Sequence, residues 1–268
     1  MPSAISPATV EGWYALHQVF GVDWGAVRSG DPRVGSALDE VDAFFAPPAE
    51  DGAGWSLAAR LVGGGADLLF VHFRPDLESL ADLQLRLRRS VLGSLLHLRY
   101  DFLSITEAGL YHATVSVAAE HDPGTEEYER ALAERVRAEA ESAHVKTRLF
   151  PRVPEGMRYL TFYPMNKRRE GEDNWYTLPV DARNRMMREH GLTGRRYAGR
   201  IFQVITGSVG LDDWEWGVTL FARDPLDFKR IVTDMRYDEV SARYGEFGSF
   251  FTGIRMEAGD WRRLLGPE

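Results

Sequence analysis

Residues 200–222, RIFQVITGSVGLDDWEWGVTLFA, predict a β-hairpin. Two runs rich in β-branched and aromatic side chains, 200–210 and 213–222, flank Gly210, where the chain is expected to turn. The segments on either side of this hairpin indicate the fold to which it belongs.

One strand and one helix are predicted on each side of the hairpin. Upstream, residues 158–165 form an apolar strand, and residues 178–191 form a short helix that ends at Gly191. Downstream, residues 224–245 form a helix with an apolar face, and residues 248–256 form a last strand. The second half therefore runs strand, helix, two strands, helix, strand.

The first half, from about Val10 to Ala119, repeats this order. Its predicted elements are a strand at 13–20, a helix and then a Pro-, Gly- and Ala-rich loop within 31–55, a strand at 66–73, a helix at 74–96 and further β-like runs within 101–118. A charged helix and an extended, proline-containing connector within 122–156 join the two halves. The repeat is one of pattern, because few residues are identical between the halves.

Helices that gather on one face of a largely antiparallel sheet are typical of an α+β sandwich. The sequence therefore predicts the α+β class, with two tandem ferredoxin-like repeats and antiparallel sheets, of the dimeric α+β barrel type. We expect residues 1–145 to form the N-terminal repeat plus a linker helix, and residues 146–268 to form the C-terminal, ligand-binding repeat.

Composition narrows the class of protein. The 268 residues are 44% hydrophobic and 27% charged, as in an ordinary globular protein. The chain has no cysteine, which excludes disulfides, thiolate metal sites and cysteine nucleophiles and favours a reducing compartment. The N-terminal residues do not resemble a signal peptide, and no apolar run approaches the ~20 residues that span a bilayer. We therefore expect a cytoplasmic protein without a membrane span.

The formal net charge of −8 bears on the possible ligands. An acidic protein is poorly suited to broad nucleic-acid binding, so we expect no nucleic-acid partner. Any anionic ligand would have to be attracted locally, by a few well-placed cations.

Residues 161–176, TFYPMNKRREGEDNWY, supply an unusual pattern of this kind. Residues two apart in a strand share a face. If the strand continues slightly past Pro164, then Tyr163, Met165 and Lys167 lie on one side of it. A phenol, a thioether and an ammonium would then project together from one strand end.

Further cations lie close to this face along the chain. Arg148 precedes the strand in the connector, and Arg168 and Arg169 follow it. The phenol, the thioether and the two cations Lys167 and Arg148 near one strand end suit a planar, partly apolar ligand that carries carboxylates, whereas the roles of Arg168 and Arg169 stay open. The alternative interpretation is a snorkelling lysine beside a solvated basic turn, because runs of charge usually face water.

His190 is the candidate metal ligand. It lies in the last turn of the predicted helix, where a histidine can simply interact with the helix dipole. A neutral imidazole also binds iron, and one helical histidine suffices for a five-coordinate haem. Non-haem iron normally needs more ligands, and the sequence contains no HxxxH or HExxH. If His190 binds a metal, haem iron is the favoured case.

Three residues stand out within the predicted hairpin. Gln203 shares a strand face with apolar residues, and burying its amide without partners would cost about 1–3 kcal/mol. The amide is therefore either a satisfied core group or part of a ligand cavity. Trp214 and Trp216 are predicted on one strand face, either as core residues or as the lining of a porphyrin pocket.

Taken together, several segments resemble the coproheme decarboxylases, which belong to the chlorite dismutase-like superfamily. These segments are YPMNKRREGEDNWY (163–176), MMREHG (186–191), GSVGLDDWEWGVTLF (207–221) and MRYDEVSARYGEFGSFF (235–251). The resemblance to the non-actinobacterial branch is nearly continuous from about Lys146 to Phe251. It is looser in the first half, where EGWYALHQVFGVDW (11–24) and ADLLFVHFRP (66–75) carry it.

The resemblance implies an assembly and a reaction. Members of this family have two ferredoxin-like repeats per subunit and usually form homopentamers. They use hydrogen peroxide to decarboxylate two propionates of iron-coproporphyrin III (coproheme), which leaves vinyl groups and so gives haem b, the last step of coproporphyrin-dependent haem biosynthesis. Coproheme is then both substrate and redox cofactor. A transient contact with coproporphyrin ferrochelatase would fit this place in the sequence of reactions.

The resemblance also implies roles for particular residues. His190 corresponds to the proximal iron ligand, and Tyr163 to the redox-active residue whose radical attacks a propionate. Lys167 corresponds to a residue that holds a propionate and assists proton transfer. The other correspondences are Arg148 and Ser241 as propionate-binding residues, Met165 as part of the pocket lining, and Gln203 on the distal side of the iron.

Gln203 also separates the alternative functions. True chlorite dismutases share the fold but carry a distal arginine at this position, and an amide cannot supply that fixed charge. Actinobacterial coproheme decarboxylases have a distal histidine without a clear counterpart here, which leaves the source of peroxide deprotonation open. The remaining alternative is a haem carrier or sensor, which needs His190 but neither Tyr163 nor Lys167.

Overall fold

The structure, a computed structural model, describes residues 5–46 and 52–266, so part of the predicted proline-rich loop lies outside the described residues. The first half comprises β1 (Thr9–Val22), α1 (Trp24–Ser29), α2 (Arg33–Phe45), β2 (Trp55–Leu61), β3 (Leu68–Arg74), α3 (Leu77–Arg89), α4 (Val91–Ser94), β4 (Leu96–Gly109), α5 (Tyr111–Glu120), α6 (Glu126–Ala140) and α7 (Ala143–Leu149). The second half comprises β5 (Tyr159–Lys167), β6 (Arg169–Glu170), β7 (Asp173–Asn174), a short 3-10 helix (Trp175–Thr177), α8 (Val180–Arg195), β8 (Ile201–Gly207), β9 (Trp216–Ala222), α9 (Leu226–Met235), α10 (Glu239–Tyr244), β10 (Gly245–Phe247), β11 (Phe251–Arg255) and α11 (Ala258–Leu265).

The main strands form one nine-stranded antiparallel sheet that closes on itself. Its order is β10-β5-β11-β2-β3-β1-β4-β8-β9, and β9 also pairs with β5. Strands β2 and β4 of the first half pair with β11 and β8 of the second, so both halves contribute to one barrel. This arrangement confirms the predicted α+β class. The predicted division into residues 1–145 and 146–268 falls inside α7 and stays a prediction.

Alternate residues of each strand point into the barrel or away from it. The interior is filled by an apolar cluster that includes Phe102, Phe162 and Phe221, all of them at 0% exposure. His17 is buried in the same interior, with Nε2 2.8 Å from Thr219 Oγ1, and burial lowers the pKa of this imidazole to about 3. The interior is therefore packed core, which leaves the outer face of the barrel for a ligand.

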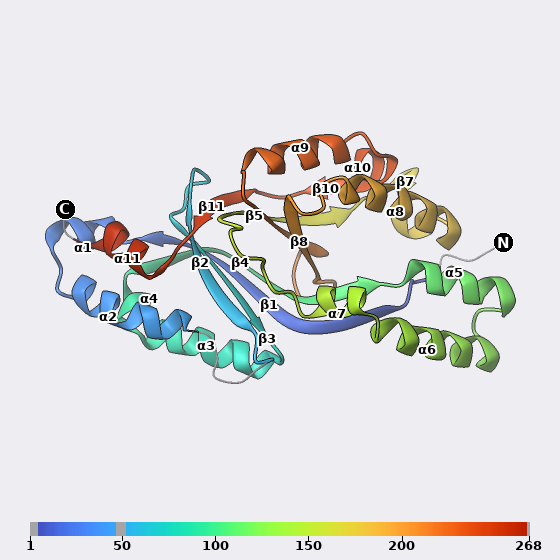
Figure 1. Cartoon of the computed structure of the whole chain (residues 1–268), viewed down its shortest axis with the longest axis horizontal. Helices are drawn as coiled ribbons and strands as arrows, with labels where there is room; N and C mark the ends of the chain where they lie inside the picture. The colour runs from blue at the N-terminus through green and yellow to red at the C-terminus, as the bar shows by residue number, and fades with distance from the viewer. Residues whose placement is uncertain (1–4, 47–51, 267–268) are drawn as a thin grey trace.

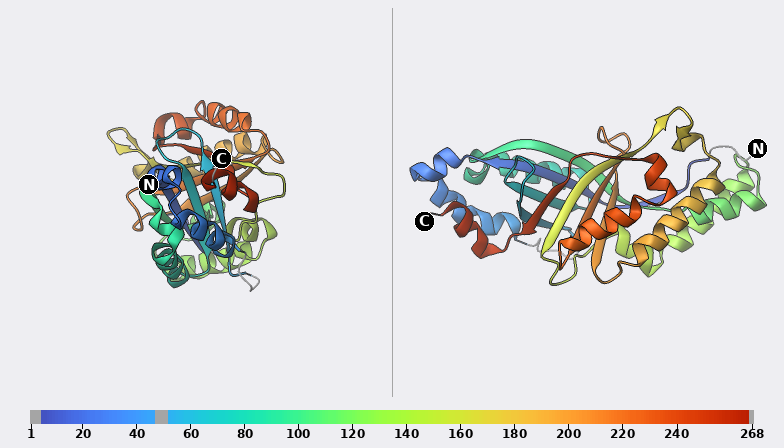
Figure 2. Two further views of the ribbon diagram at one scale, coloured as in Figure 1. Left: turned by 90° about the vertical axis from the view of Figure 1, so that its left-hand side faces the viewer. Right: turned by 90° about the horizontal axis from the view of Figure 1, so that it is seen from above.

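Besides α5, α6 and α7, which pack together and on β1 and β4, two groups of helices lie around the barrel, as Figures 1 and 2 show. The first group, α2, α3, α4 and α11, lies at one end of the barrel and buries side chains such as Phe44, Leu83 and Trp261. The second group, α8, α9 and α10, lies beside β5 and β9 at the other end. In this group α9 packs on β9, whereas α8 packs on α5, α9 and α10. No helix of the described residues is long and apolar enough to cross a membrane.

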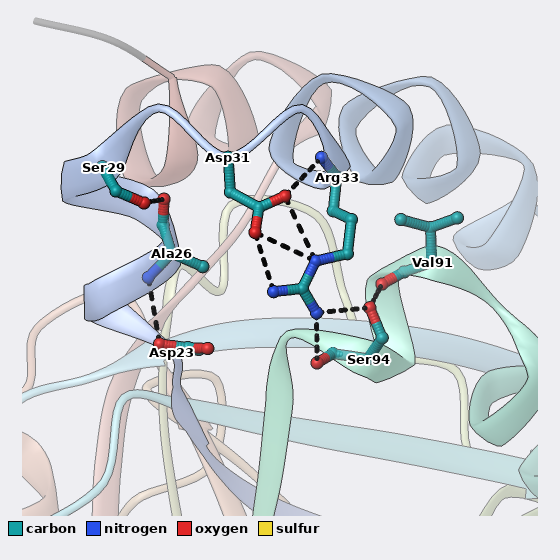
Figure 3. A network of polar contacts seen from close by, with 7 residues as sticks. All are labelled: Asp23, Ala26, Ser29, Asp31, Arg33, Val91 and Ser94. Atoms are coloured by element: carbon teal, nitrogen blue, oxygen red, sulfur yellow. Dashed lines mark hydrogen bonds and ion pairs between the residues drawn. The ribbon is translucent and has the colours of Figure 1, made fainter.

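A polar network holds the corner between α1 and α2 against α4 (Figure 3). The carboxylate of Asp23 caps α1 and accepts a hydrogen bond from Ala26 N at 3.0 Å. The guanidinium of Arg33 donates to Asp31 at 2.8 Å and reaches Ser94 O at 3.5 Å. This network stabilises the end of the barrel opposite α8.

The helix predicted over residues 224–245 is in fact two helices, α9 and α10. The chain leaves the helix after α9, and Asp238 begins α10 as its N-cap, where its Oδ1 accepts from Ser241 N at 2.8 Å. Aspartate favours this position because its side chain satisfies a free N–H of the first turn. The break matters for the site, because it turns the Asp238 carboxylate toward α8.

Two other predicted elements differ in the structure. Residues 111–118, predicted to be β-like, belong to α5, which buries Ala113, Thr114 and Val117 with helical spacing. Helix α8 does not end at Gly191 but continues to Arg195, since a glycine inside a helix costs only about 1 kcal/mol relative to alanine.

The two tryptophans of the hairpin do not share a strand face, contrary to the prediction. Strand β9 begins only at Trp216, because residues 208–215 form the turn, in which Ser208 Oγ donates to Trp214 O at 2.6 Å. Trp214 packs against the interior cluster, whereas Trp216 lies on the outer face of the sheet.

Candidate functional site

The outer face of β5 carries three of the predicted site residues. The strand continues through Pro164, whose carbonyl joins the sheet by accepting a hydrogen bond from Gly248 N at 2.9 Å. Because the strand is unbroken, Tyr163, Met165 and Lys167 project from the same face, as the alternation of a strand requires. The structure thus brings these three side chains together.

Tyr163 is almost completely enclosed, with 5% of its surface exposed. Its ring stacks on Phe250 with 4.4 Å between ring centroids and contacts Phe247 at 5.9 Å. Burial raises the pKa of the Tyr163 phenol, and the nearby charge of Arg236 only partly opposes this effect. The phenol is therefore neutral at physiological pH, and oxidising it requires that a proton leave together with the electron.

Lys167 ends the same strand in a buried position, with 8% of its surface exposed. Its backbone N donates to Glu215 Oε2 at 2.8 Å, and its Nζ lies 5.0 Å from the ring centroid of Trp175. Burial lowers the pKa of the Lys167 ammonium to about 8, against the opposing charges of Asp238 and Glu215. A lysine with this pKa can both attract an anion and exchange a proton near neutral pH.

Gln203 lies on the continuation of this face across two neighbouring strands. The register pairs Ile205 with Val218, and Val218 in turn with Tyr163. Cross-strand partners share a face, so Ile205 and Gln203 point to the same outer side as Tyr163. Gln203 is exposed, which excludes the satisfied core amide and leaves the amide free to contact a ligand.

His190 approaches from helix α8. Its Nδ1 lies 2.8 Å from Asp238 Oδ2, and 23% of its side chain is exposed. Although burial alone would raise the pKa of Asp238, the hydrogen bonds from His190 and from Ser241 N lower it overall, so the carboxylate is charged. With Nδ1 engaged in this way, Nε2 is the nitrogen available to a metal.

Asp238, which the sequence analysis missed, connects the helix to the sheet. One carboxylate oxygen caps α10 and the other contacts His190, while the same charge acts on the Lys167 ammonium. Ser241, at 7% exposure, lies in the first turn of α10 beside this carboxylate. An aspartate three residues before a serine at a helix start was the available signal, but it indicates a cap and says nothing of the histidine.

The three arginines near this face lie in different places. Arg148 belongs to α7, which packs on β1 and β4 rather than on β5, so its role in binding stays a prediction. Arg168 and Arg169 flank the exposed β6–β7 turn, where they lie 3.6 Å from the carboxylates of Asp173 and Glu215 respectively. Arg168 is thus paired within the β6–β7 segment, whereas Arg169 is paired with a carboxylate of the turn that joins β8 to β9.

The sequence matches the chlorite dismutase family over residues 35–256. This chain belongs to the chlorite dismutase family. Among its relatives, a coproheme decarboxylase of Thermus thermophilus is 42% identical over 262 residues, which cover 96% of this chain and 96% of that protein. The resemblance found in the sequence motifs is therefore confirmed.

Solved structures of the family agree with the fold described above. A heme-binding protein from Thermus thermophilus superposes with a TM-score of 0.84 at 40% identity, and the match covers 100% of this chain and 99% of that one. The chlorite dismutase of Candidatus Nitrospira defluvii in complex with imidazole has a TM-score of 0.69 at 18% identity, with 96% of each chain covered. The second comparison shows a shared fold only.

The donor set of this family member fits an iron porphyrin better than a bare metal ion. The described residues contain no group of three metal-ligating side chains, and a lone histidine suits only a metal that brings its other ligands with it. His190 supplies a free Nε2 on the helix side, and Lys167 supplies a buried cation for an acidic substituent. The exposed amide of Gln203 lies on the sheet side.

A separate open cleft of about 520 Å³ lies elsewhere on the barrel. Arg99, Tyr100, Phe250 and Phe251 are among its lining residues, and none of the predicted site residues lines it. The cleft meets the candidate site only where Phe250 stacks on Tyr163.

We expect the affinity of the apoprotein for coproheme to fall as the pH rises through about 8, the pKa of the buried Lys167 ammonium. Only the protonated amine attracts a propionate, so the dissociation constant should rise by up to about tenfold per pH unit above that value. Lys167→Arg keeps the charge and should abolish this dependence. Lys229→Met, on the exposed side of α9, is the matched control. Quenching of tryptophan fluorescence by added coproheme measures the affinity, and a pH-independent wild type would contradict the assignment.

Proposed function

We propose that this chain is a coproheme decarboxylase, which uses hydrogen peroxide to convert iron-coproporphyrin III into haem b. The observation that carries the proposal is the connection of His190, through Asp238, to Lys167 on the face that Tyr163 shares. A candidate metal ligand, a candidate cation for a propionate and an oxidisable phenol together support the proposal. The 42% identity to a relative named coproheme decarboxylase supports the same conclusion.

Each of the two decarboxylations is a two-electron oxidation. A propionate loses carbon dioxide from its end and one hydrogen from the carbon next to the porphyrin ring, and a vinyl group remains. The two electrons, with the proton from that hydrogen and one from solvent, reduce one hydrogen peroxide to two waters. Ferric coproheme, the substrate itself, supplies the iron centre through which the electrons pass.

Tyr163 and Lys167 have different roles at the propionate. The Tyr163 phenol gives up an electron and a proton, and the resulting tyrosyl radical regains a hydrogen atom from the propionate chain. Lys167 Nζ holds the carboxylate in place and exchanges the phenol proton, for which its pKa of about 8 is suited. The fixed position of both groups on one strand face keeps the reacting hydrogen near the phenol.

The other predicted residues complete the proposed pocket. His190 holds the iron from the helix side, and Gln203 faces it from the sheet side. Ser241 and Arg148 bind further propionates, which a chain with a net charge of −8 must attract locally. Met165 lines the apolar part of the pocket between Tyr163 and Lys167.

Two alternative functions would require different residues at this site. A chlorite dismutase or general peroxidase would need a fixed charge on the sheet side, whereas the chain presents the neutral amide of Gln203 there. A haem carrier would have no use for a buried phenol and a lysine of lowered pKa on the same face. Both are therefore less well supported than decarboxylation.

The proposal includes the compartment, the assembly and the partner of the enzyme. The absence of cysteine fits a reducing compartment, and we place the protein in the cytoplasm. By resemblance to its family it would assemble as a homopentamer and receive coproheme from coproporphyrin ferrochelatase in a transient contact. Sedimentation of the loaded protein would measure the assembly.

The test is to load purified protein with ferric coproheme, add hydrogen peroxide in steps and follow the mass of the porphyrin. Loss of one carboxyl group and then a second, ending in haem b, is the expected result. An unchanged porphyrin mass with an intact spectrum would identify a carrier instead. Consumption of chlorite with release of oxygen would identify a chlorite dismutase.

A further inference from the structure

Glu107 is a carboxylate on the outer face of the sheet to which the proposed mechanism gives no role. It belongs to β4, where the apolar Leu103 and Ile105 precede it on the same face. The register pairs Ile105 with Gly207 of β8, two residues from Ile205, so Glu107 shares its face with Gln203. It therefore lies on the sheet side of the site, opposite the helix that carries His190.

The position of the Glu107 carboxylate is fixed by residues on two neighbouring strands. Its Oε1 accepts a hydrogen bond from the indole Nε1 of Trp216 in β9 at 2.8 Å. To reach Trp216 the side chain crosses β8 at Gly207, where any Cβ would collide with the carboxylate. Because Gly207 has no side chain, the Glu107 carboxylate can reach the Trp216 indole. The second carboxylate oxygen of Glu107, Oε2, does not bond to the indole.

The surroundings of Glu107 favour a carboxyl group that exchanges protons. Burial raises the pKa of Glu107, the Trp216 hydrogen bond partly opposes this, and the charge of Glu11 raises it further. Glu11 lies directly across from Glu107 on β1, and Tyr111 is the titratable neighbour on α5. Helix α7 meets β4 from the opposite face, where Thr106 Oγ1 donates to Leu149 O at 2.7 Å.

On the two strands that the Glu107 side chain crosses and contacts, β8 and β9, no outward side chain can act as a base. The outward residues of β8 are Ile201, Gln203, Ile205 and Gly207, and those of β9 are Trp216, Val218, Leu220 and Ala222. None of these side chains has an ionisable group, and an amide does not accept a proton near neutral pH. Glu107 is thus the one carboxylate that reaches across these two strands.

We propose that Glu107 is the proton acceptor for hydrogen peroxide on the sheet side of the bound porphyrin, an inference that rests on the proposed function. Hydrogen peroxide gives one proton to Glu107 Oε2 and becomes the hydroperoxide anion, while the carboxylate becomes a neutral carboxyl group. Trp216 holds the other oxygen and so keeps Oε2 directed at the peroxide. The proton returns to the product water, which restores the carboxylate.

Binding of cyanide to the ferric, coproheme-loaded protein tests this role without turnover, because hydrogen cyanide must also lose a proton before it binds iron. Glu107→Gln keeps an acceptor for Trp216 but removes the base, and should slow cyanide binding by about 10²-fold. Gly207→Ala should slow it to a similar extent by displacing the carboxylate. Carbon monoxide, which carries no proton, should bind the ferrous forms of both variants as fast as wild type.

The pH dependence gives a second, independent readout. The cyanide rate of the wild type should fall on acidification as Glu107 becomes protonated. Glu11→Gln removes the neighbouring charge, lowers the pKa of Glu107 and should move this fall to a lower pH. Unchanged cyanide rates in Glu107→Gln or in Gly207→Ala, or an unshifted profile in Glu11→Gln, would overturn the proposal. A protein that failed to bind coproheme would instead refute the proposed function.

Discussion

Tyr163→Phe is expected to bind ferric coproheme as tightly as the wild type and to lose decarboxylation by about 10³-fold or more. The substitution retains the ring that stacks on Phe250 at 4.4 Å, so the pocket should keep its shape. It removes the phenol that the mechanism oxidises, and a phenylalanine ring cannot be oxidised in its place. Peroxide should then bleach the porphyrin without releasing carbon dioxide.

Tyr159→Phe is the matched control for this variant. Tyr159 begins the same strand and the same face, four residues from Tyr163, which is about 13 Å along an extended chain. It pairs with Ala222 at the far end of β9 and should tolerate the loss of its hydroxyl with turnover intact. Full turnover in Tyr163→Phe would show that the oxidising equivalent reaches the propionate by another route.

His190→Ala should abolish the spectrum of a histidine-ligated ferric porphyrin. Loss of the iron bond is expected to weaken coproheme binding by about 10²-fold, which corresponds to about 2.8 kcal/mol, while the propionate contacts retain part of the affinity. Added imidazole should occupy the space next to Asp238 and restore the spectrum, because Asp238 can still orient a ring nitrogen. Absorption and resonance Raman spectra measure both effects.

His144→Ala provides the control, because His144 is exposed on α7 and should not contact the porphyrin. A second comparison is Asp238→Asn, which keeps the cap of α10 but removes the charge beside His190. That variant should retain iron binding with a shifted iron–histidine stretching frequency. Retention of the wild-type spectrum in His190→Ala would mean that another residue ligates the iron.

The repeated fold could be predicted from the sequence because some strands, such as β8, alternate inward and outward side chains, and others, such as β3, are continuous apolar runs. The hairpin of β8 and β9 and the passage of β5 through Pro164 follow from that alternation and are confirmed. The errors arose where local preference and tertiary contact disagree. Residues 111–120 contain β-branched side chains but bury them with helical spacing. The apolar helical pattern of residues 224–245 continues past Asp238, but the helix is interrupted there because Asp238 is the N-cap of α10.

The candidate site could be predicted only in part. Strand periodicity alone placed Tyr163, Met165 and Lys167 together, because residues two apart must share a face. Asp238 and Glu107 were missed, because their partners His190 and Trp216 lie 48 and 109 residues away and only the fold brings them close. An acidic residue that follows the outward apolar Leu103 and Ile105 of β4 was the local sign of Glu107.

A crystal structure of the complex with ferric coproheme tests the central claim most directly. It should show the iron bound to His190 Nε2, one propionate at Lys167 beside the Tyr163 phenol, and Gln203 on the other side of the porphyrin. Porphyrin bound in the cleft of Arg99, Tyr100 and Phe250, or iron bound to a different histidine, would contradict the account.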